Sequence, residues 1–278
     1  MAAVVTDSAS NLPPELADEA GIQVVPLYLA FGDEVLRDGV DIRPDEFYRR
    51  LASDGSATSS TPSPGDFLEA FRATGDREIV CVTVAASMSA AHQQALAAAE
   101  RFDGTVRVVD SGSASMAQGF VALSAARTLA AGGSPEAAEA RARETAERVR
   151  LIATVDTFDY LRRSGRVSSL QAYAATVLDI KPVFAFRRGE PFALARPRTR
   201  RRAVDRVVEA ALADIGGRPV HLATMHAAAP AEARALADRI AAATDVVEQV
   251  VVEVTPVIGA HTGPGLLGAA FFCDRATG

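Results

Sequence analysis

The sequence predicts an α/β protein of two domains, the first on a parallel, doubly wound sheet and the second on a mixed sheet. At 278 residues, with 49% apolar and 23% charged side chains, the chain forms a globular core and is long enough for two domains. In its first half, buried strand patterns alternate with helical ones, which favours parallel pairing. Beyond residue 150, strands also follow one another through a hairpin. We therefore expect domains over 1–150 and 151–278.

Apolar runs and helical spacings give the elements of the first half in order. We expect strands over 2–6, 22–30, 79–84 and 106–109. Helices are expected over 13–20 and 43–54. Four more are expected: one that begins at Pro64, one that ends at Phe102, one that ends at Ala131 and one that begins at Ser134. The run 53–64 between two of them is too rich in Ser, Thr and Pro for a regular element. It ends at Ser63, a good N-cap before a Pro in the first helical position.

The second half has a different order of elements. Strands are expected over 151–155, 182–186, 192–194, 219–225, 246–254 and 267–273, and helices over 199–213 and 231–242. The residues 187–190 have the composition of a hairpin turn. A sheet that combines hairpins with crossovers is mixed.

Composition excludes several classes of protein. The two cysteines, Cys81 and Cys273, each lie in an apolar run, which predicts buried reduced thiols and excludes a disulfide scaffold. The first residues lack the basic start of a signal peptide. Two stretches without charged residues, 79–99 and 254–273, are too polar or too rich in Gly and Pro to span a membrane. We expect a soluble, cytoplasmic protein.

Charge is distributed unevenly along the chain. Residues 160–206 contain 12 of the 29 basic residues and 3 of the 35 acidic ones, a net charge of +9 against −15 for the remainder. All basic residues except Lys181 are Arg, which is typical of a bias in genome composition. The basic window is either a solvated face or a local patch for an anionic partner. The acidic total argues against a general nucleic-acid binder.

The familiar motifs of catalysis and cofactor binding are weak or absent. Residues 263–268 match G-x-G-x-x-G, but too little chain follows for a dinucleotide fold, so we interpret them as a tight turn. The four histidines lack metal-site spacing, and we expect no metal and no cofactor. Asp7, Asp110 and Asp179 are candidate catalytic carboxylates or acceptors for loop amides.

Neutral hydrogen-bond donors are the remaining candidates for a site. Thr58 begins a hydroxyl-dense run, Ser87 and Ser89 precede a helix, and His261 lies in a Gly-rich loop. Together they are suited to hold a carboxylate without a lysine or a metal. Helix capping and turn formation explain the same residues.

Seven short motifs, taken in order, resemble those of the DegV family of bacterial fatty-acid-binding proteins. They are VTDS (5–8), the hydroxyl-rich loop before PS (62–63), VDS (109–111), SGRV (164–167), IKP (180–182), RTR (198–200) and HTGPG (261–265). The resemblance implies a two-domain carrier that holds one long-chain fatty acid as its ligand between the domains and is not itself an enzyme. It further implies that a separate fatty acid kinase phosphorylates the carboxylate for phospholipid synthesis.

The resemblance also implies roles for particular residues. Thr58, Ser89 and His261 match the positions that bind the carboxylate. The positions that would face the kinase are Arg166, Arg198, Arg200 and Arg201. The chain departs from the family pattern at Thr61, Ala85, Ala86, Ala90 and Ala91, where the family has Gln, Ser-Ser and Gly-Thr. These departures bear on acyl selectivity and pocket depth but leave the three donors in place.

Two other classes compete with a carrier. A lipid hydrolase or acyltransferase would use Ser89 as nucleophile and His261 as base, although no nucleophile-elbow sequence is present. A DNA-binding regulator would use the basic window, although no helix-turn-helix pattern is present. Lipid that can be extracted from the purified protein distinguishes the carrier from both.

Overall fold

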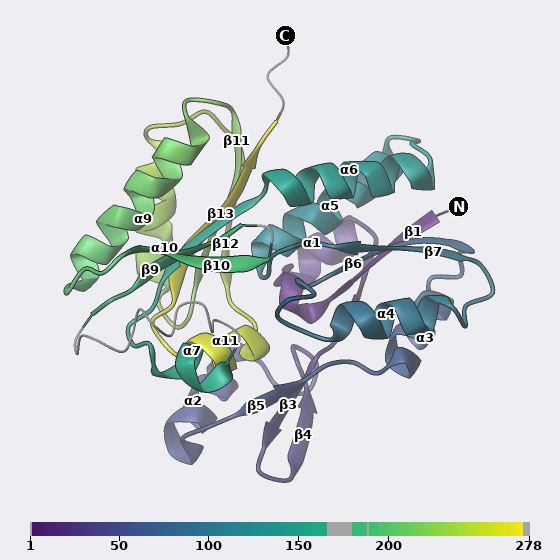
Figure 1. Ribbon diagram of the computed structural model, residues 1–278, viewed down its shortest axis with the longest axis horizontal. Helices are drawn as coiled ribbons and strands as arrows, with labels where there is room; N and C mark the ends of the chain where they lie inside the picture. The colour runs from purple at the N-terminus through teal and green to yellow at the C-terminus, as the bar shows by residue number, and fades with distance from the viewer. Residues whose placement is uncertain (1, 166–179, 188, 275–278) are drawn as a thin grey trace. The chain divides into compact units, whose positions relative to one another are not determined.

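The computed structural model describes residues 2–165, 180–187 and 189–274, and its contacts divide the chain into two units. Unit 1 consists of Met1–Glu147 with Thr255–Val257, and unit 2 of Arg148–Val254 with Ile258–Gly278. The α/β class is confirmed, with a parallel sheet in unit 1 and a mixed sheet in unit 2 (Figure 1).

A parallel sheet forms the centre of unit 1. Its strands are β1 (Ala2–Asp7), β2 (Ile22–Val25), β6 (Glu78–Thr83) and β7 (Thr105–Asp110), in the order β2-β1-β6-β7. All three pairings are parallel, and Val4 is paired with both Ile22 and Val80. The β-branched residues of β1 and β6 are buried because helices cover both faces of the sheet.

Five helices surround this sheet. They are α1 (Pro14–Glu19), α3 (Pro64–Ala73), α4 (Ala91–Ala99), α5 (Met116–Ala130) and α6 (Pro135–Arg148). Figure 1 shows α5 and α6 on one side of the strands and α3 and α4 on the other, which confirms double winding. Helix α3 begins as expected, because Ser63 is the N-cap directly before Pro64 and forms a reciprocal capping box with Asp66 in the first turn.

Unit 1 further contains a small antiparallel sheet, one α-helix and a one-turn 3-10 helix, η1 (Ser8–Ser10), and two sequence predictions fail in this part. The strand predicted over 22–30 is two strands, since β2 ends before Pro26 and β3 (Tyr28–Phe31) joins a second sheet. Proline lacks the amide hydrogen that a continuous ladder needs. The run predicted to be irregular contains β5 (Thr58–Ser60), which pairs with β3, as does β4 (Glu34–Arg37). Helix α2 (Pro44–Asp54) buries Phe47 and Leu51.

Unit 2 is built on a six-stranded mixed sheet in the order β10-β9-β8-β13-β11-β12. The strands are β8 (Arg150–Thr154), β9 (Val183–Arg187), β10 (Glu190–Ala195), β11 (Val220–His226), β12 (Val246–Glu253) and β13 (Leu267–Cys273). Strands β11 and β12 are parallel and the other neighbours antiparallel. The expected hairpin joins β9 and β10, although residue 188 of its turn lies outside the described residues.

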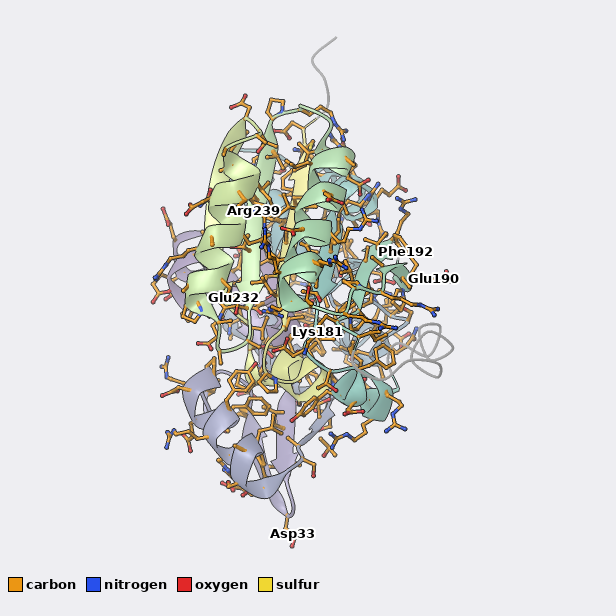
Figure 2. The ribbon with its side chains drawn as sticks, turned by 90° about the vertical axis from the view of Figure 1, so that its left-hand side faces the viewer. Asp33, Lys181, Glu190, Phe192, Glu232 and Arg239 are labelled. Atoms are coloured by element: carbon orange, nitrogen blue, oxygen red, sulfur yellow. The ribbon has the colours of Figure 1, made fainter. Side chains whose placement is uncertain are left out.

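Two long helices cover one face of this sheet. Helices α9 (Arg200–Ile215) and α10 (Pro230–Ala241) bury Val207, Leu236 and Ile240 against Leu267 and Phe271. Arg239 Nη2 donates to Asp205 Oδ1 at 2.8 Å and so joins the two helices (Figure 2). Two short helices without a sequence prediction complete the described part: α7 (Asp159–Ser164) and α11 (Pro256–Thr262).

Candidate functional site

The segments that follow three strands of the parallel sheet carry a group of serine hydroxyls in unit 1. Strands β1, β6 and β7 are parallel, so the segments after their carboxyl ends meet at one edge of the sheet. This is the edge at which open α/β sheets bind their ligands. The hydroxyl-bearing residues in these segments are Ser8, Ser10, Ser87, Ser89, Ser111, Ser113 and Ser115.

Ser89 lies at the end of a tight turn after β6. Its amide donates to the carbonyl of Ala85 at 3.2 Å, and its half-buried Oγ accepts the amide of Ala91, the first residue of α4, at 3.2 Å. A hydroxyl that accepts one hydrogen bond can still donate one. The Ser89 hydroxyl therefore keeps a donor for a carboxylate. The imidazole of His92, in the same unit, contacts Thr83 Oγ1 through Nδ1 at 3.0 Å.

Thr58 is exposed at the beginning of β5. Its backbone is in register with Ala30 of β3, and Ser60 is in register with Tyr28. The strand pairing, rather than a flexible loop, thus holds the Thr58 hydroxyl. Tyr28 Oη in turn donates to Asp66 Oδ1 of the α3 cap at 3.1 Å.

His261 belongs to unit 2, where the expectation of a loop at this residue is wrong. It lies in the last turn of α11 and is half-buried. Helix α11 ends at Thr262, and the amide of Gly263 donates to the carbonyl of Gly259 at 2.8 Å. The imidazole is consequently held on a helix next to a glycine turn.

The glycines after His261 allow the backbone to pass close to two side chains. Gly263 and Gly265 have φ values of +72° and +83°, and a Cβ on either would come within 2.2 Å of Tyr160 or Asp156. Only glycine meets both conditions without strain. The interpretation of 263–268 as a turn is thereby supported over a dinucleotide fingerprint, since β13 follows at Leu267.

Of the four arginines expected to face a partner, Arg200 makes contacts within unit 2. Its Nη1 donates to the carbonyl of Gly265 and lies 3.4 Å from Asp156 Oδ1, and its Nε donates to Glu232 Oε2 at 2.8 Å. Lys181 Nζ donates to the carbonyl of Asp156 at 2.8 Å. Figure 2 shows Glu232 and Lys181 at the same end of this unit.

The other three arginines differ from Arg200. Arg198 and Arg201 are exposed at the start of α9. Arg166 lies outside the described residues, as does Asp179. The structure thus separates one arginine with an internal role from two on the surface.

The aspartates at the ends of β1 and β7 accept loop amides. Asp7 Oδ1 accepts the amide of Ala9 at 3.1 Å, and its Oδ2 accepts that of Val84 at 2.8 Å. Asp110 Oδ1 accepts the amides of Gly112 and Ala86 at 2.8 and 3.2 Å. Of the two interpretations of these carboxylates, the structure supports the acceptor role. Sequence reasoning did not connect them with Ser89, although an Asp-Ser pair at a strand end was the available signal.

Two carboxyl groups in unit 1 are deeply buried and near each other. Burial raises the pKa of Asp7 from 3.8 to about 6, against hydrogen bonds from Gln118, Val84 and Ala9 that lower it. Burial also raises the pKa of Asp38 to about 6, against hydrogen bonds from Ser8 and Val257, and the charge of Asp7 adds to the rise. Asp38 was not singled out from the sequence, because nothing in its neighbourhood marks it as buried.

The described residues contain few other candidates for chemistry. Across residues 2–165, 180–187 and 189–274, no group of three or more His, Cys, Asp or Glu side chains is placed to hold a metal ion. Within the same ranges no helix has both the length and the apolar character needed to cross a bilayer. Cys81 and Cys273 are buried free thiols, as expected, and burial raises the pKa of each.

The fold and these loops define a two-unit α/β protein with hydroxyl groups at the carboxyl edge of a parallel sheet and an imidazole beside a glycine turn. A model of the DegV family, described as uncharacterised proteins, matches residues 1–274. The chain belongs to the DegV family.

Matches to individual relatives and solved structures cover nearly the whole chain. A DegV domain-containing protein of Streptomyces coelicolor is 40% identical over 270 residues, 96% of each chain. A fatty-acid-binding DegV family protein from Thermus thermophilus has a TM-score of 0.91 at 31% identity, covering 98% of this chain and 99% of its own. A stearic-acid-binding protein from Eubacterium ventriosum has a TM-score of 0.89 at 25% identity, covering 98% of both.

Proposed function

We propose that this chain binds one long-chain fatty acid and that Thr58, Ser89 and His261 bind its carboxylate. The observation that carries the proposal is the match along nearly the whole chain to the Thermus thermophilus protein, which binds fatty acid on the same fold. The three side chains support it chemically, because two hydroxyls and an imidazole supply donors to a carboxylate without a metal.

The apolar chain and the carboxylate of a fatty acid contribute differently to the free energy of binding. Each buried methylene contributes about 0.8 kcal/mol, so a long acyl chain contributes on the order of 10 kcal/mol before the costs of binding. Hydrogen bonds to a charged group contribute about 1.5–3 kcal/mol each. The acyl chain therefore supplies most of the affinity, and the donors determine which end of the molecule is held at the site.

The second part of the proposal is that a separate fatty acid kinase acts on the bound carboxylate. In this scheme the chain is a carrier, and the kinase forms the acyl phosphate used for phospholipid synthesis. The net charge of +9 over residues 160–206, in a chain that is −15 elsewhere, supports an electrostatic docking surface. Arg198 and Arg201 are exposed within it, and Arg166 belongs to it by sequence.

Native mass spectrometry tests the binding of lipid. The purified chain is expected to lose the mass of one free fatty acid on denaturation. After delipidation it is expected to take up one equivalent of stearic acid. A chain that purifies without ligand and whose spectrum does not change when stearic acid is added would contradict the proposal.

A further inference from the structure

The loop between β6 and α4 is held through three successive backbone amides. The amide of Val84 donates to Asp7 Oδ2 at 2.8 Å, that of Ala85 to the carbonyl of Ser113 at 2.8 Å, and that of Ala86 to Asp110 Oδ1 at 3.2 Å. Ala85 and Ala86 carry no polar side chains, so the loop contributes only backbone amides to these bonds, and two of the three acceptors are side-chain carboxylates. A loop held at three consecutive residues has little freedom left in its first turn.

The acceptors come from both sides of β6. Asp7 ends β1 and Asp110 ends β7, and these two strands are the neighbours of β6 in the sheet. The carboxylates thus hold the beginning of the loop from opposite sides. This placement follows from the parallel order of the strands, which brings their carboxyl ends to one edge.

A short series of hydrogen bonds leads from the held amides to Ser89. Ala85 donates its amide to Ser113, and its carbonyl accepts the amides of Met88 at 2.9 Å and Ser89 at 3.2 Å. Ser89 Oγ then accepts the amide of Ala91 at the start of α4. Any shift of Ala85 and Ala86 is thereby transmitted to the position of the Ser89 hydroxyl.

We infer that Asp7 and Asp110 are positioning residues that place the Ser89 hydroxyl for a ligand carboxylate. The inference rests on the proposed function for its ligand. Neither aspartate is required to contact the ligand: Asp7 is fully buried, and the bonds of Asp110 described above are to backbone amides.

The two aspartates differ in a way that allows a sharp test. Asp7 accepts hydrogen bonds on both oxygens, from Val84 on Oδ2 and from Ala9 and Gln118 on Oδ1. An asparagine there must turn its amide NH₂ toward a donor, so Asp7→Asn is expected to disturb the loop. Asp110 accepts both of its loop amides on the single atom Oδ1. The carbonyl oxygen of an asparagine can replace that atom, so Asp110→Asn is expected to keep the loop in place.

The experiment compares Asp110→Ala with Asp110→Asn in the full chain, using stearic acid and octadecanol as probes. Asp110→Ala is expected to weaken stearic acid binding by roughly fivefold or more, whereas octadecanol binding changes by less than about twofold. Asp110→Asn is expected to restore stearic acid affinity to within about twofold of the parent. The matched control is Thr74→Ala, since Thr74 Oγ1 accepts the amide of Asp76 at 3.2 Å before the amino end of β6. This control is expected to leave both probes unaffected.

A double variant tests whether the effect passes through Ser89. When Ser89 is already replaced by Ala, adding Asp110→Ala is expected to weaken stearic acid binding by less than about twofold more, because the effects of substitutions at coupled residues are not additive. Full additivity, or an equal loss for acid and alcohol with Asp110→Ala, would overturn the inference. So would Asp110→Asn binding as weakly as Asp110→Ala.

Hydrogen exchange of the unliganded chain separates this inference from the proposed function. Asp110→Ala and Asp7→Asn are expected to accelerate exchange of the amides of Ala85 and Ser89, and Asp110→Asn to leave it near the parental rate. If the parent binds no stearic acid, the proposed function fails. The exchange measurement still decides whether Asp7 and Asp110 hold the loop between β6 and α4. Unchanged exchange in both disruptive variants would show that the aspartates do not hold the loop.

Discussion

Arg200 donates a hydrogen bond from Nη1 to the carbonyl oxygen of Gly265, in the turn that follows the helix of His261. The same guanidinium is paired with Glu232 and lies 3.4 Å from Asp156, so it connects α9, the start of α10 and this turn. A planar cation with several donors is suited to such a position, and lysine is not. The geometry thus gives Arg200 a role inside unit 2 that the exposed Arg201 does not share.

The first prediction separates these two arginines. Arg200→Ala is expected to lower the free energy of unfolding by about 1 kcal/mol, because a hydrogen bond to a backbone carbonyl and two partly exposed ion pairs are lost. It is also expected to accelerate amide exchange at Gly265, which is bonded to the carbonyl of Ala227 at 3.1 Å. Urea unfolding and hydrogen exchange measure the two effects. Arg201→Ala serves as the control, and equal behaviour of the two variants would contradict the internal role.

The second prediction concerns recognition of the carboxylate. Ser89→Ala and Thr58→Val each remove a hydroxyl and nearly preserve side-chain size. Each is expected to weaken stearic acid binding roughly tenfold, since a hydrogen bond to a charged acceptor is lost. Octadecanol has no charge, so its binding is expected to fall much less. Fluorescence displacement with both probes measures the difference, and equal losses would mean that the hydroxyls shape the site without binding the carboxylate.

Much of the fold could be predicted because burial and periodicity agree along most of the chain. The strand predicted over 267–273 coincides with β13, and Ser63 caps α3 as its sequence indicated. The failures have local causes. The polar strand β5 is stabilised by pairing with β3, a partner distant in sequence, so its composition gave no signal. The apolar run 22–30 contains two strands that belong to different sheets, on either side of Pro26, and its composition does not distinguish them.

The site was less predictable than the fold because its connections are long-range. Asp7 and Val84 are bonded across 77 positions of sequence. Residue type shows that Asp7 is an acceptor but not which amide it accepts. The return of Thr255–Val257 to unit 1 is similar, since the amide of Val257 donates to Asp38 at 3.0 Å across 219 positions. Such pairings depend on the order of strands in the sheet, which a single sequence does not specify.

The third prediction follows from the buried carboxyl of Asp38. Its folded pKa is about 6, above the usual 3.8, so the folded state binds more protons than the unfolded state between these values. The contribution of Asp38 to the free energy of unfolding therefore falls as pH rises from about 4 to about 6. Above about pH 6 this contribution is constant. Asp38→Asn is expected to reduce that slope. Urea unfolding across this pH range measures it. An identical slope in parent and variant would contradict the raised pKa.

The fourth prediction contrasts the histidines at the two ends of β11. Burial alone lowers the pKa of His221, but hydrogen bonds to Glu248 and Asp274 at 2.6 and 3.0 Å outweigh it, and the pKa is raised above 6.5. Burial lowers the pKa of His226 below 6.5. His221 thus contributes stability that is present below pH 6.5 and lost as pH rises through its folded pKa. His226 costs stability as pH falls below 6.5.

Nuclear magnetic resonance titration of the imidazole protons checks this contrast directly. His221 is expected to titrate above 6.5 and His226 below it. Glu248→Gln removes the first carboxylate partner and is expected to lower the His221 midpoint while leaving that of His226 in place. A pair of midpoints in the reverse order would contradict the contacts of one or both residues.

The last prediction concerns docking of the proposed kinase. Charge attraction between proteins acts over the screening length, about 8–10 Å at physiological salt, so removing exposed arginines slows association most at low salt. The test is a triple variant that combines Arg166→Ala, Arg198→Ala and Arg201→Ala. Its lipid content is expected to stay at the parental level. The same triple variant is expected to reduce acyl-phosphate formation by the cognate kinase several-fold and to flatten its salt dependence. Phosphorylation at the parental rate would show that the basic window is a solvated face. Loss of lipid from the triple variant would instead place these arginines with the proposed fatty-acid site, because a surface that only docks the kinase would not affect lipid binding.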